Sequence, residues 1–216
     1  MCADTVRIVS AAWLHDDRCK LQLSTGAVFF IRTAYLAQLK PEDIAADRPY
    51  TEDGTQDLIQ AGFAYAAEQA AHAYLGRSEH SRHMLERKLA AKKQFDGASI
   101  QKALDYLETR GILSDSRFAR AWLHARTAHK AESRRRLAAE LAARGVSTRD
   151  AEAALDELFS DISEEELCRR AAARRRRSGK SDDAIRRALC LQGFPARLAA
   201  RCLSEDSSDT ERQISE

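Results

Sequence analysis

The apolar positions along most of this chain recur at intervals of three and four residues, the spacing typical of amphipathic helices. In the stretch from Gly111 to Val146, polar residues separate two such stripes, and glycines bound them. Gly111 and Gly145 stand where helices end, and we expect Gly145 in a left-handed conformation. Ser114 or Asp115 is placed to cap the first of the two helices. The stripes consist of Phe118, Ala119, Trp122 and Leu123, and of Leu137, Ala138, Leu141 and Ala142.

The same order of apolar positions occurs three times, which indicates an internal repeat. Leu137 has counterparts in Leu85, 52 positions earlier, and in Ile185, 48 positions later. Each copy reads as a helix, a polar turn, a second helix, a short turn with one large apolar residue, and a third helix. Such a unit buries its apolar faces only against a neighbour. The matching positions are Leu85, Leu89, Phe95, Ile100, Leu104 and Leu107; Leu137, Leu141, Val146, Ala151, Leu155 and Leu158; and Ile185, Leu189, Phe194, Ala199 and Leu203.

Within the middle unit we expect Trp122 in the core, beside Phe118 and facing Leu137 and Leu141. Residues 55–77 are also predicted to be helical, with one apolar face. The alanines of that face permit a close approach of neighbouring helices. The predicted face consists of Leu58, Ile59, Phe63, Ala66, Ala70, Ala73, Tyr74 and Leu75.

Residues 5–32 have a different pattern. The short runs TVRIVSAAWL, RCKLQLS and AVFFIRT are rich in strand-forming residues and are separated by polar turn residues. These signals predict a small antiparallel sheet of about three strands. A short helix around Tyr35 to Leu39, a turn at Pro41 and a polar connector through Pro49 are expected to follow. The segment serves either as a docking module or as a stabilising appendage, because a small sheet gains stability only by packing on something.

The predicted fold is therefore mainly α: a tandem array of three three-helix, helix-turn-helix-like repeats, preceded by a small antiparallel β segment. Aromatic residues make up only 6% of the chain, which agrees with thin, repeated helix packing. The predicted segments are 1–54 (β segment, short helix and connector), 55–112, 113–161 and 162–204 (the three repeats), and 205–216 (an acidic, flexible tail).

The formal net charge of +2 conceals a strong local asymmetry. Residues 80–149 hold 16 lysines and arginines against 7 acids, residues 150–166 hold 8 acids and no base, and residues 167–201 hold 11 bases against 2 acids. Two basic blocks thus flank an acidic segment, which we expect to be one helix from Asp150 to Glu166. Alternating fields suit a long, charged partner such as a nucleoprotein filament, whereas a single charge run is often only a solvated helix face.

Arginines dominate the candidate binding residues. Arg174 to Arg177 cover a full helical turn, so at least some of them face solvent or an anion. Guanidinium groups pair with phosphate oxygens, and no aromatic stacking residues accompany them, which favours backbone contact or an acidic protein surface over base reading. The candidate partner-binding and DNA-binding residues are Arg117, Arg120, Arg126, Lys130, Arg134, Arg135, Arg136, Arg144, Arg169, Arg170, Arg174, Arg175, Arg176, Arg177, Lys180, Arg186 and Arg187.

The sequence gives no sign of catalysis or of a bound cofactor. It has no phosphate-binding glycine loop, no HExxH, no paired CxxC and no evident Ser-His-Asp set. His80 and His83 lack a third ligand at metal-binding spacing. The five scattered cysteines predict reduced thiols in the cytoplasm, with Cys190 and Cys202 on apolar faces. No apolar run of ~18 residues and no signal peptide are seen, so neither membrane insertion nor export is expected.

The sequence GILSDSRFA, followed by a basic helix and ELAARGV, resembles the centre of the RecX family of recombinase regulators. The resemblance covers roughly residues 60–204. One departure is the turn before the second helix, which commonly carries a glycine in that family and here reads Lys130, Ala131, Glu132. The matching residues are Gly111, Leu113, Asp115, Arg117, Phe118, Ala119, Arg126, Glu140, Leu141, Gly145 and Val146, with Ser81, Arg82, Leu85 and Leu89 opening the first repeat.

This resemblance implies a non-catalytic regulator of RecA in recombination, DNA repair and the SOS response. An elongated, curved array would lie in the helical groove of the RecA filament on single-stranded DNA and restrain filament growth, ATP hydrolysis, strand exchange and co-protease activity. The chain would act as a monomer in the cytoplasm, with weak direct DNA contact. The alternative is a nonspecific DNA-binding helical protein that acts through phosphate contacts. The sequence leaves open which helix faces bind, how the β segment docks, and whether regulation is only inhibitory.

Overall fold

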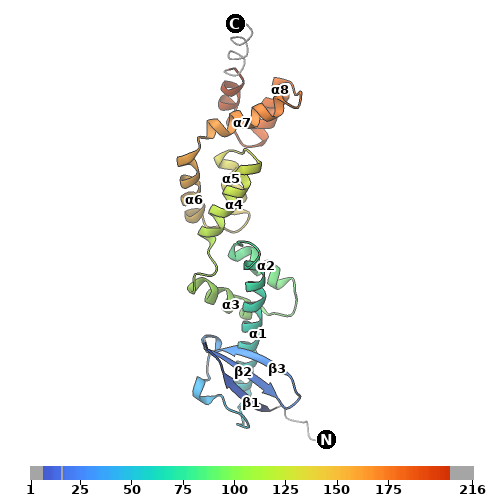
Figure 1. Cartoon of the computed structure of the whole chain (residues 1–216), viewed down its shortest axis with the longest axis vertical. Helices are drawn as coiled ribbons and strands as arrows, with labels where there is room; N and C mark the ends of the chain where they lie inside the picture. The colour runs from blue at the N-terminus through green and yellow to red at the C-terminus, as the bar shows by residue number, and fades with distance from the viewer. Residues whose placement is uncertain (1–6, 16, 205–216) are drawn as a thin grey trace. The chain divides into compact units, whose positions relative to one another are not determined.

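The computed structural model describes residues 7–15 and 17–204 (Figure 1). The chain divides into two compact units, Met1–Leu113 and Ser114–Glu216. The fold is mainly helical with one small sheet, as the sequence predicts, whereas the tail predicted over residues 205–216 lies outside the described residues. The helices are α1 (Glu52–Leu75), α2 (Arg82–Ala90), α3 (Gly97–Thr109), α4 (Asp115–His129), α5 (Arg134–Ala142), α6 (Thr148–Asp161), α7 (Glu164–Arg176) and α8 (Asp182–Leu191), followed by a helix over residues 196–204.

The predicted N-terminal sheet is confirmed. Its inward residues Leu21 and Ile31 are fully buried and share one apolar cluster with Leu58 and Ala61 of α1. The sheet therefore packs on the N-terminal half of α1, which is the support that a small sheet requires. The strands β1 (Ile8–Trp13), β2 (Arg18–Leu23) and β3 (Val28–Arg32) pair antiparallel in the order β1-β2-β3.

A carboxylate of α1 fixes the loop after the sheet. Asp57 accepts hydrogen bonds from the backbone N–H groups of Ala37 at 2.8 Å and of Gln38 and Leu39 at 2.9 Å each. Burial raises the pKa of Asp57, but the three hydrogen bonds outweigh burial and hold the pKa below its ordinary value. Because these N–H groups bind a side chain, the helix predicted around Tyr35 to Leu39 is wrong. The segment instead contains two short 3-10 helices, η1 (Thr33–Tyr35) and η2 (Pro41–Asp43).

A buried ion pair joins the sheet to α1. Arg32 donates from Nε to Glu68 Oε2 at 3.0 Å and from Nη2 to Glu68 Oε1 at 2.7 Å. The Tyr35 hydroxyl donates to the same carboxylate at 2.7 Å, and the Arg32 guanidinium lies 4.4 Å from the centre of the Tyr106 ring. Burial and the bond to Glu68 raise the pKa of the Tyr35 hydroxyl. Each buried charge thus has a partner, the condition under which burial of charge is tolerated.

The buried face of α1 differs from the predicted one. Ile59 and Phe63, placed inside by their spacing, are each 43% exposed. Alanines of α1 itself lie on both its buried and its exposed side, so the spacing of apolar residues does not distinguish the inner face. The buried polar residues Asp57 and Glu68 identify that face instead, because their partners come from the loop and the sheet. The buried residues are Gly54, Asp57, Leu58, Ala61, Ala64, Tyr65, Ala67, Glu68 and Ala71.

Three successive sets of three helices follow the predicted repeat: α1 to α3, α4 to α6, and α7, α8 and the helix over 196–204. Every apolar position matched across the three copies is buried, which confirms the spacing argument. The limits of each repeat as a separate domain stay a prediction. Helices α2 and α4 to α7 each begin at a serine whose side chain accepts a hydrogen bond from the third N–H of the helix, which satisfies a donor that would lack a partner. These serines are Ser81, Ser114, Ser133, Ser147 and Ser163.

A residue in the left-handed conformation follows the second helix of each copy, twelve positions beyond its N-cap serine. The residues are Lys93 with φ of 56°, Gly145 with 78° and Gly193 with 91°. The prediction for Gly145 is confirmed. Only the first copy places a side chain in this conformation, which glycine adopts without steric penalty.

Gly193 also permits a close approach between the middle and third copies. A Cβ atom there would collide with Ser133 Oγ and lie 3.0 Å from Arg136 Cβ. At the same place the Ser133 N–H donates to the Gln192 carbonyl at 3.2 Å. The turn after α8 therefore rests on the N-terminus of α5.

Trp122 does not lie in the core, contrary to the prediction. Leu123 and Phe118 are buried, whereas the Trp122 indole is half-buried on the outer side of α4. The guanidinium groups of Arg144 and Arg126 lie 4.5 and 5.6 Å from its ring centre. The interior position is thus filled by a leucine, and the indole is covered by cations instead.

Two further predictions are wrong. Cys190 is exposed, because its neighbour Leu189 takes the inward position of α8, whereas Cys202 is buried as expected. The acidic segment is not one helix: α6 ends at Asp161 and α7 begins at Glu164. Several of its carboxylates bind arginines of the same chain.

Candidate nucleic-acid and partner interface

The predicted binding arginines fall into two groups, those paired with carboxylates of the same chain and those that are not. The paired group reduces the positive field of the middle and third copies below what charge counting suggests, because each carboxylate screens its arginine. Its members are Arg120 with Glu157 (3.6 Å), Arg126 with Glu132 (2.6 Å), Arg136 and Arg144 with Glu140 (2.8 and 2.7 Å), Arg169 with Glu165 (2.8 Å), Arg170 with Glu166 (3.0 Å), Arg176 with Asp182 (3.4 Å) and Arg186 with Asp183 (2.9 Å).

Arg134 belongs to the paired group and holds two helices together. From the first turn of α5 its Nη2 donates to Glu152 at 2.5 Å and to Asp156 at 2.6 Å, both on α6. In the first copy, Arg82 stands at the same place beside its cap and binds Asp105 of α3 at 2.7 Å. Arg134, one of the predicted binding residues, is therefore engaged in an ion pair between two helices of the chain.

The next residue behaves differently. Arg135 is exposed and forms no ion pair within residues 7–15 and 17–204. Arg187 on α8 is likewise exposed and without an acidic partner in that part of the chain. These two guanidinium groups are free to meet a partner, whereas Arg134 is not.

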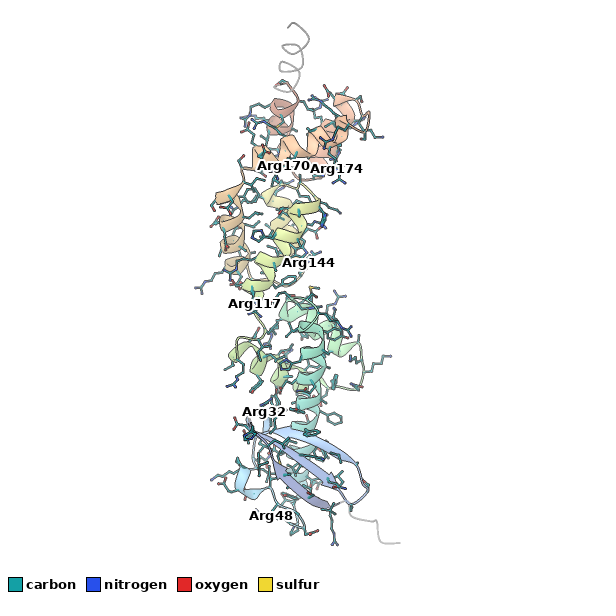
Figure 2. All side chains as sticks on the ribbon, viewed as in Figure 1. Arg32, Arg48, Arg117, Arg144, Arg170 and Arg174 are labelled. Atoms are coloured by element: carbon teal, nitrogen blue, oxygen red, sulfur yellow. The ribbon has the colours of Figure 1, made fainter. Side chains whose placement is uncertain are left out.

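A cation-covered indole occupies the outer surface of the middle copy. Arg144, labelled in Figure 2, lies over the Trp122 ring and donates to Glu140 Oε2 at 2.7 Å. The hydrogen bond from Arg144 holds the pKa of Glu140 below its ordinary value. Arg136 donates to the other oxygen of Glu140 at 2.8 Å. Two arginines share one carboxylate in this cluster, so it provides a structured surface with a single net positive charge.

A cleft of about 820 Å³ opens between the turn that joins α4 to α5 and the helix α7. Arg174 Nη1 donates to the His129 carbonyl at 2.9 Å and so links the two elements. Figure 2 shows Arg170 and Arg174 side by side on α7. The cationic residues that line the cleft are Lys130, Arg170, Arg174, Arg175 and Arg177.

The cleft is strongly positive because its carboxylate, Glu132, pairs with an arginine outside the lining and does not neutralise the lining cations. Glu132, the acid among the described lining residues, is buried and accepts two hydrogen bonds from Arg126, at 2.6 and 3.0 Å. Of the cations, Lys130, Arg174, Arg175 and Arg177 form no ion pair within the described residues. Gln192 also lines the cleft, and its Oε1 is buried without a hydrogen-bond partner in the described chain. The cations of the cleft can bind an anion.

Sequence reasoning found the cations of the cleft but not the cleft. Lys130 and the arginines of α7 lie at least forty positions apart, so only the packing of α7 against the α4–α5 turn brings them together. Glu132 and Gln192 were missed because neither belongs to a basic run. The predicted binding residues that do not line the cleft are Arg117, Arg120, Arg126, Arg134, Arg135, Arg136, Arg144, Arg169, Arg176, Lys180, Arg186 and Arg187.

Other kinds of site are not formed by the described residues. Within them no group of histidine, cysteine or carboxylate side chains could hold a metal ion. His80 instead contacts the Ser78 carbonyl at 2.9 Å and the Lys88 amine at 2.5 Å. No helix over the same residues has the length and apolarity needed to cross a membrane.

Known proteins resemble this chain in sequence. Residues 114–155 match the family model of the RecX second three-helix domain. A protein from Treponema pallidum (strain Nichols) named "Regulatory protein RecX" is 41% identical over 143 residues, which span 66% of this chain and 87% of that protein. A protein of the same name from Halorhodospira halophila is 34% identical over 160 residues, 69% of this chain and 96% of its own.

Solved structures resemble it in fold. One, described as the crystal structure of regulatory protein RecX, has a TM-score of 0.69 at 15% identity and covers 93% of this chain and 100% of its own. The crystal structure of RecX from Lactobacillus salivarius has a TM-score of 0.56 at 20% identity and covers 66% and 96%. At such identities the likeness concerns the fold alone.

Proposed function

The chain belongs to the RecX family, and from this premise we propose that it regulates the recombinase RecA by binding the RecA filament on single-stranded DNA. It would lie in the helical groove of the filament and inhibit filament growth, ATP hydrolysis, strand exchange and co-protease activity. It would act as a monomer in the cytoplasm, by occupying the filament groove and without catalysing a reaction.

One observation supports this proposal beyond family membership: a cleft of the second compact unit gathers cations that have no acidic partner among the described residues. Lys130, Arg174 and Arg177 at the cleft, and Arg135 and Arg187 outside it, lack acidic partners among the described residues. A nucleoprotein filament offers both phosphates and acidic protein surface, and unpaired cations attract either. Arginines already paired within the chain would contribute less, because their carboxylates would have to be displaced first.

The test is DNA-dependent ATP hydrolysis by the RecA of the same organism, measured with this chain at substoichiometric amounts. We expect the rate to fall. The variant Arg135→Glu/Arg187→Glu should inhibit less, since like-charge contacts across an interface weaken binding by several kcal/mol. Arg87→Glu/Arg149→Glu changes the same charge at two exposed sites outside the predicted set and serves as the control. An unchanged hydrolysis rate at every ratio of the two proteins would contradict the proposal.

The cleft favours a second candidate, a nonspecific DNA-binding protein that acts through phosphate contacts alone. Such a protein would slow RecA only by competing for DNA. Excess RecA-free DNA would then abolish the inhibition, and variants would lose DNA affinity and inhibition in parallel. If Arg135→Glu/Arg187→Glu loses inhibition while keeping its affinity for naked single-stranded DNA, a contact with the RecA protein is supported instead.

A further inference from the structure

We propose that the cleft between the α4–α5 turn and α7 binds the phosphodiester backbone of single-stranded nucleic acid, without reading its sequence. This inference deepens the proposed function, because the RecA filament is where such a strand would be met. It assigns the contact to one cleft and to few of the basic residues, and it is tested without RecA.

The comparison of the repeated units is the first support. Arg126 lies twelve residues beyond the N-cap Ser114, and Glu132 directly precedes the next N-cap; together they form the ion pair that closes the middle copy. In the third copy, the residue twelve positions beyond the N-cap Ser163 is Arg175, and the residue directly before the next N-cap is Lys180.

The third copy thus has two cations where the middle copy has a cation and its carboxylate. Of these two cations, Arg175 lines the cleft and Lys180 does not. Among the described residues Arg175 has no acidic partner, and it donates to the Ala171 carbonyl of its own helix at 3.4 Å. A structural ion pair has been replaced by charge that the described fold does not neutralise. Concentrated like charge opposes folding through self-repulsion, so an anionic ligand that relieves it gains affinity.

The walls of the cleft are the second support. Lys130 projects from the α4–α5 turn, and Arg174 and Arg177 come from α7 on the other side. The Arg174 guanidinium is held by the His129 carbonyl and is therefore already ordered, which reduces the entropy lost on binding. Cations on both sides of a concave surface suit one strand of phosphates, whereas a duplex presents a convex surface too wide to enter.

The remaining lining residues distinguish nucleic acid from an acidic peptide. The apolar side chains in the lining are alanines, namely Ala128, Ala131, Ala171 and Ala173. Peptide recognition draws its affinity from large side chains seated in pockets, and these described residues offer no such pocket. Arginine-rich walls without a large apolar pocket therefore favour a polynucleotide strand over a peptide.

The experiment measures fluorescence anisotropy of a fluorescein-labelled oligothymidylate over a salt series. The variant is Lys130→Gln/Arg174→Gln/Arg177→Gln, and the control Arg87→Gln/Arg149→Gln/Arg197→Gln removes three exposed cations elsewhere. We expect the cleft variant to lose roughly tenfold or more in affinity and its log–log salt slope to fall by about 2, near 0.7 per lost phosphate contact. The control should keep nearly the wild-type slope. The double variant Lys130→Gln/Arg177→Gln leaves the Arg174 contact with His129 intact. Its losses of affinity (on a logarithmic scale) and of salt slope should each be about two thirds of those of the triple variant.

Three outcomes would overturn the assignment. These are an unchanged slope in both cleft variants, an equal loss in the control, and tighter, cleft-dependent binding of polyglutamate than of oligothymidylate, which would make the cleft a peptide site. A failure of the proposed function, RecA regulation, would give a different result from a failure of the cleft assignment. Wild-type protein would leave RecA ATP hydrolysis unaffected while oligothymidylate binding still depended on the cleft, and the cleft assignment would stand.

Discussion

At the scale of single residues, the left-handed position after each second helix gives a direct test of backbone strain. Lys93 occupies it in the first copy, where the other copies have glycine. A side chain in this conformation costs about 1–2 kcal/mol, and glycine loses about 0.5–1 kcal/mol through the freedom of its unfolded chain. We therefore expect Lys93→Gly to stabilise the first unit by up to about 1 kcal/mol in urea unfolding. Lys93→Ala removes the same charge but keeps the strain, so it should not stabilise.

Trp122 gives the second residue-scale prediction. A fully buried tryptophan cut to alanine typically loses about 3–5 kcal/mol. Because the indole is half-buried under Arg144, we expect Trp122→Ala to lose only about 1–2 kcal/mol, from partial burial and the cation–π contact. Trp122→Phe should retain most of the stability. A loss of ~4 kcal/mol in thermal or urea unfolding would show that the ring belongs to the core after all.

At the scale of elements, two adjacent arginines should separate structural from free charge. Arg134→Gln removes the bridge from α5 to Glu152 and Asp156 of α6, and we expect a loss of about 1 kcal/mol, given that Arg134 is 33% exposed. Arg135→Gln is the matched change one residue along and should alter stability by less than ~0.5 kcal/mol. Equal melting temperatures for the two variants would contradict the structural role of Arg134.

Asp57 should make the first unit sensitive to acid. Its pKa is depressed in the folded state, so its stabilisation is complete above the unfolded pKa of about 3.9 and disappears as pH falls through the lower folded value. Asp57→Asn should lower stability at pH 7 by about 1–3 kcal/mol, because amide N–H groups of the loop lose a charged acceptor. Its urea midpoint should also fall less steeply between about pH 5 and pH 2. A slope like that of the wild type would refute this role.

The elements also show how far sequence patterns reach. The repeat was predictable because five of the six matched positions occur in all three copies, and every matched position marks an inward face. The inner face of α1 was not, since alanine on every side leaves no contrast and the two buried acids look like surface residues. Ion pairs such as Arg134 with Asp156 escape prediction as well, because they depend on how helices far apart in sequence are rotated.

At the scale of the whole molecule, the second compact unit contains every residue that lines the cleft. We therefore expect the fragment Ser114–Glu216 to unfold cooperatively alone and to bind oligothymidylate with the salt slope of the full chain. The fragment Met1–Leu113 is the control and should bind weakly. Loss of binding by the folded second fragment would mean that the first unit takes part. The cleft is formed from segments distant in sequence. The charge count along the chain therefore shows its cations only as parts of the two basic blocks, residues 80–149 and 167–201, and does not predict that they meet.

The absence of a side chain at Gly193 has a consequence for how this protein can evolve. The third copy meets the middle copy where any β-carbon would collide with Ser133, so its place downstream depends on one position. The first copy carries Lys93 there and could not take that place by gene duplication or shuffling without first mutating to glycine. The copies are thus alike in fold but not interchangeable in order, and lengthening the array by duplication would succeed only with a donor unit that already carries this glycine.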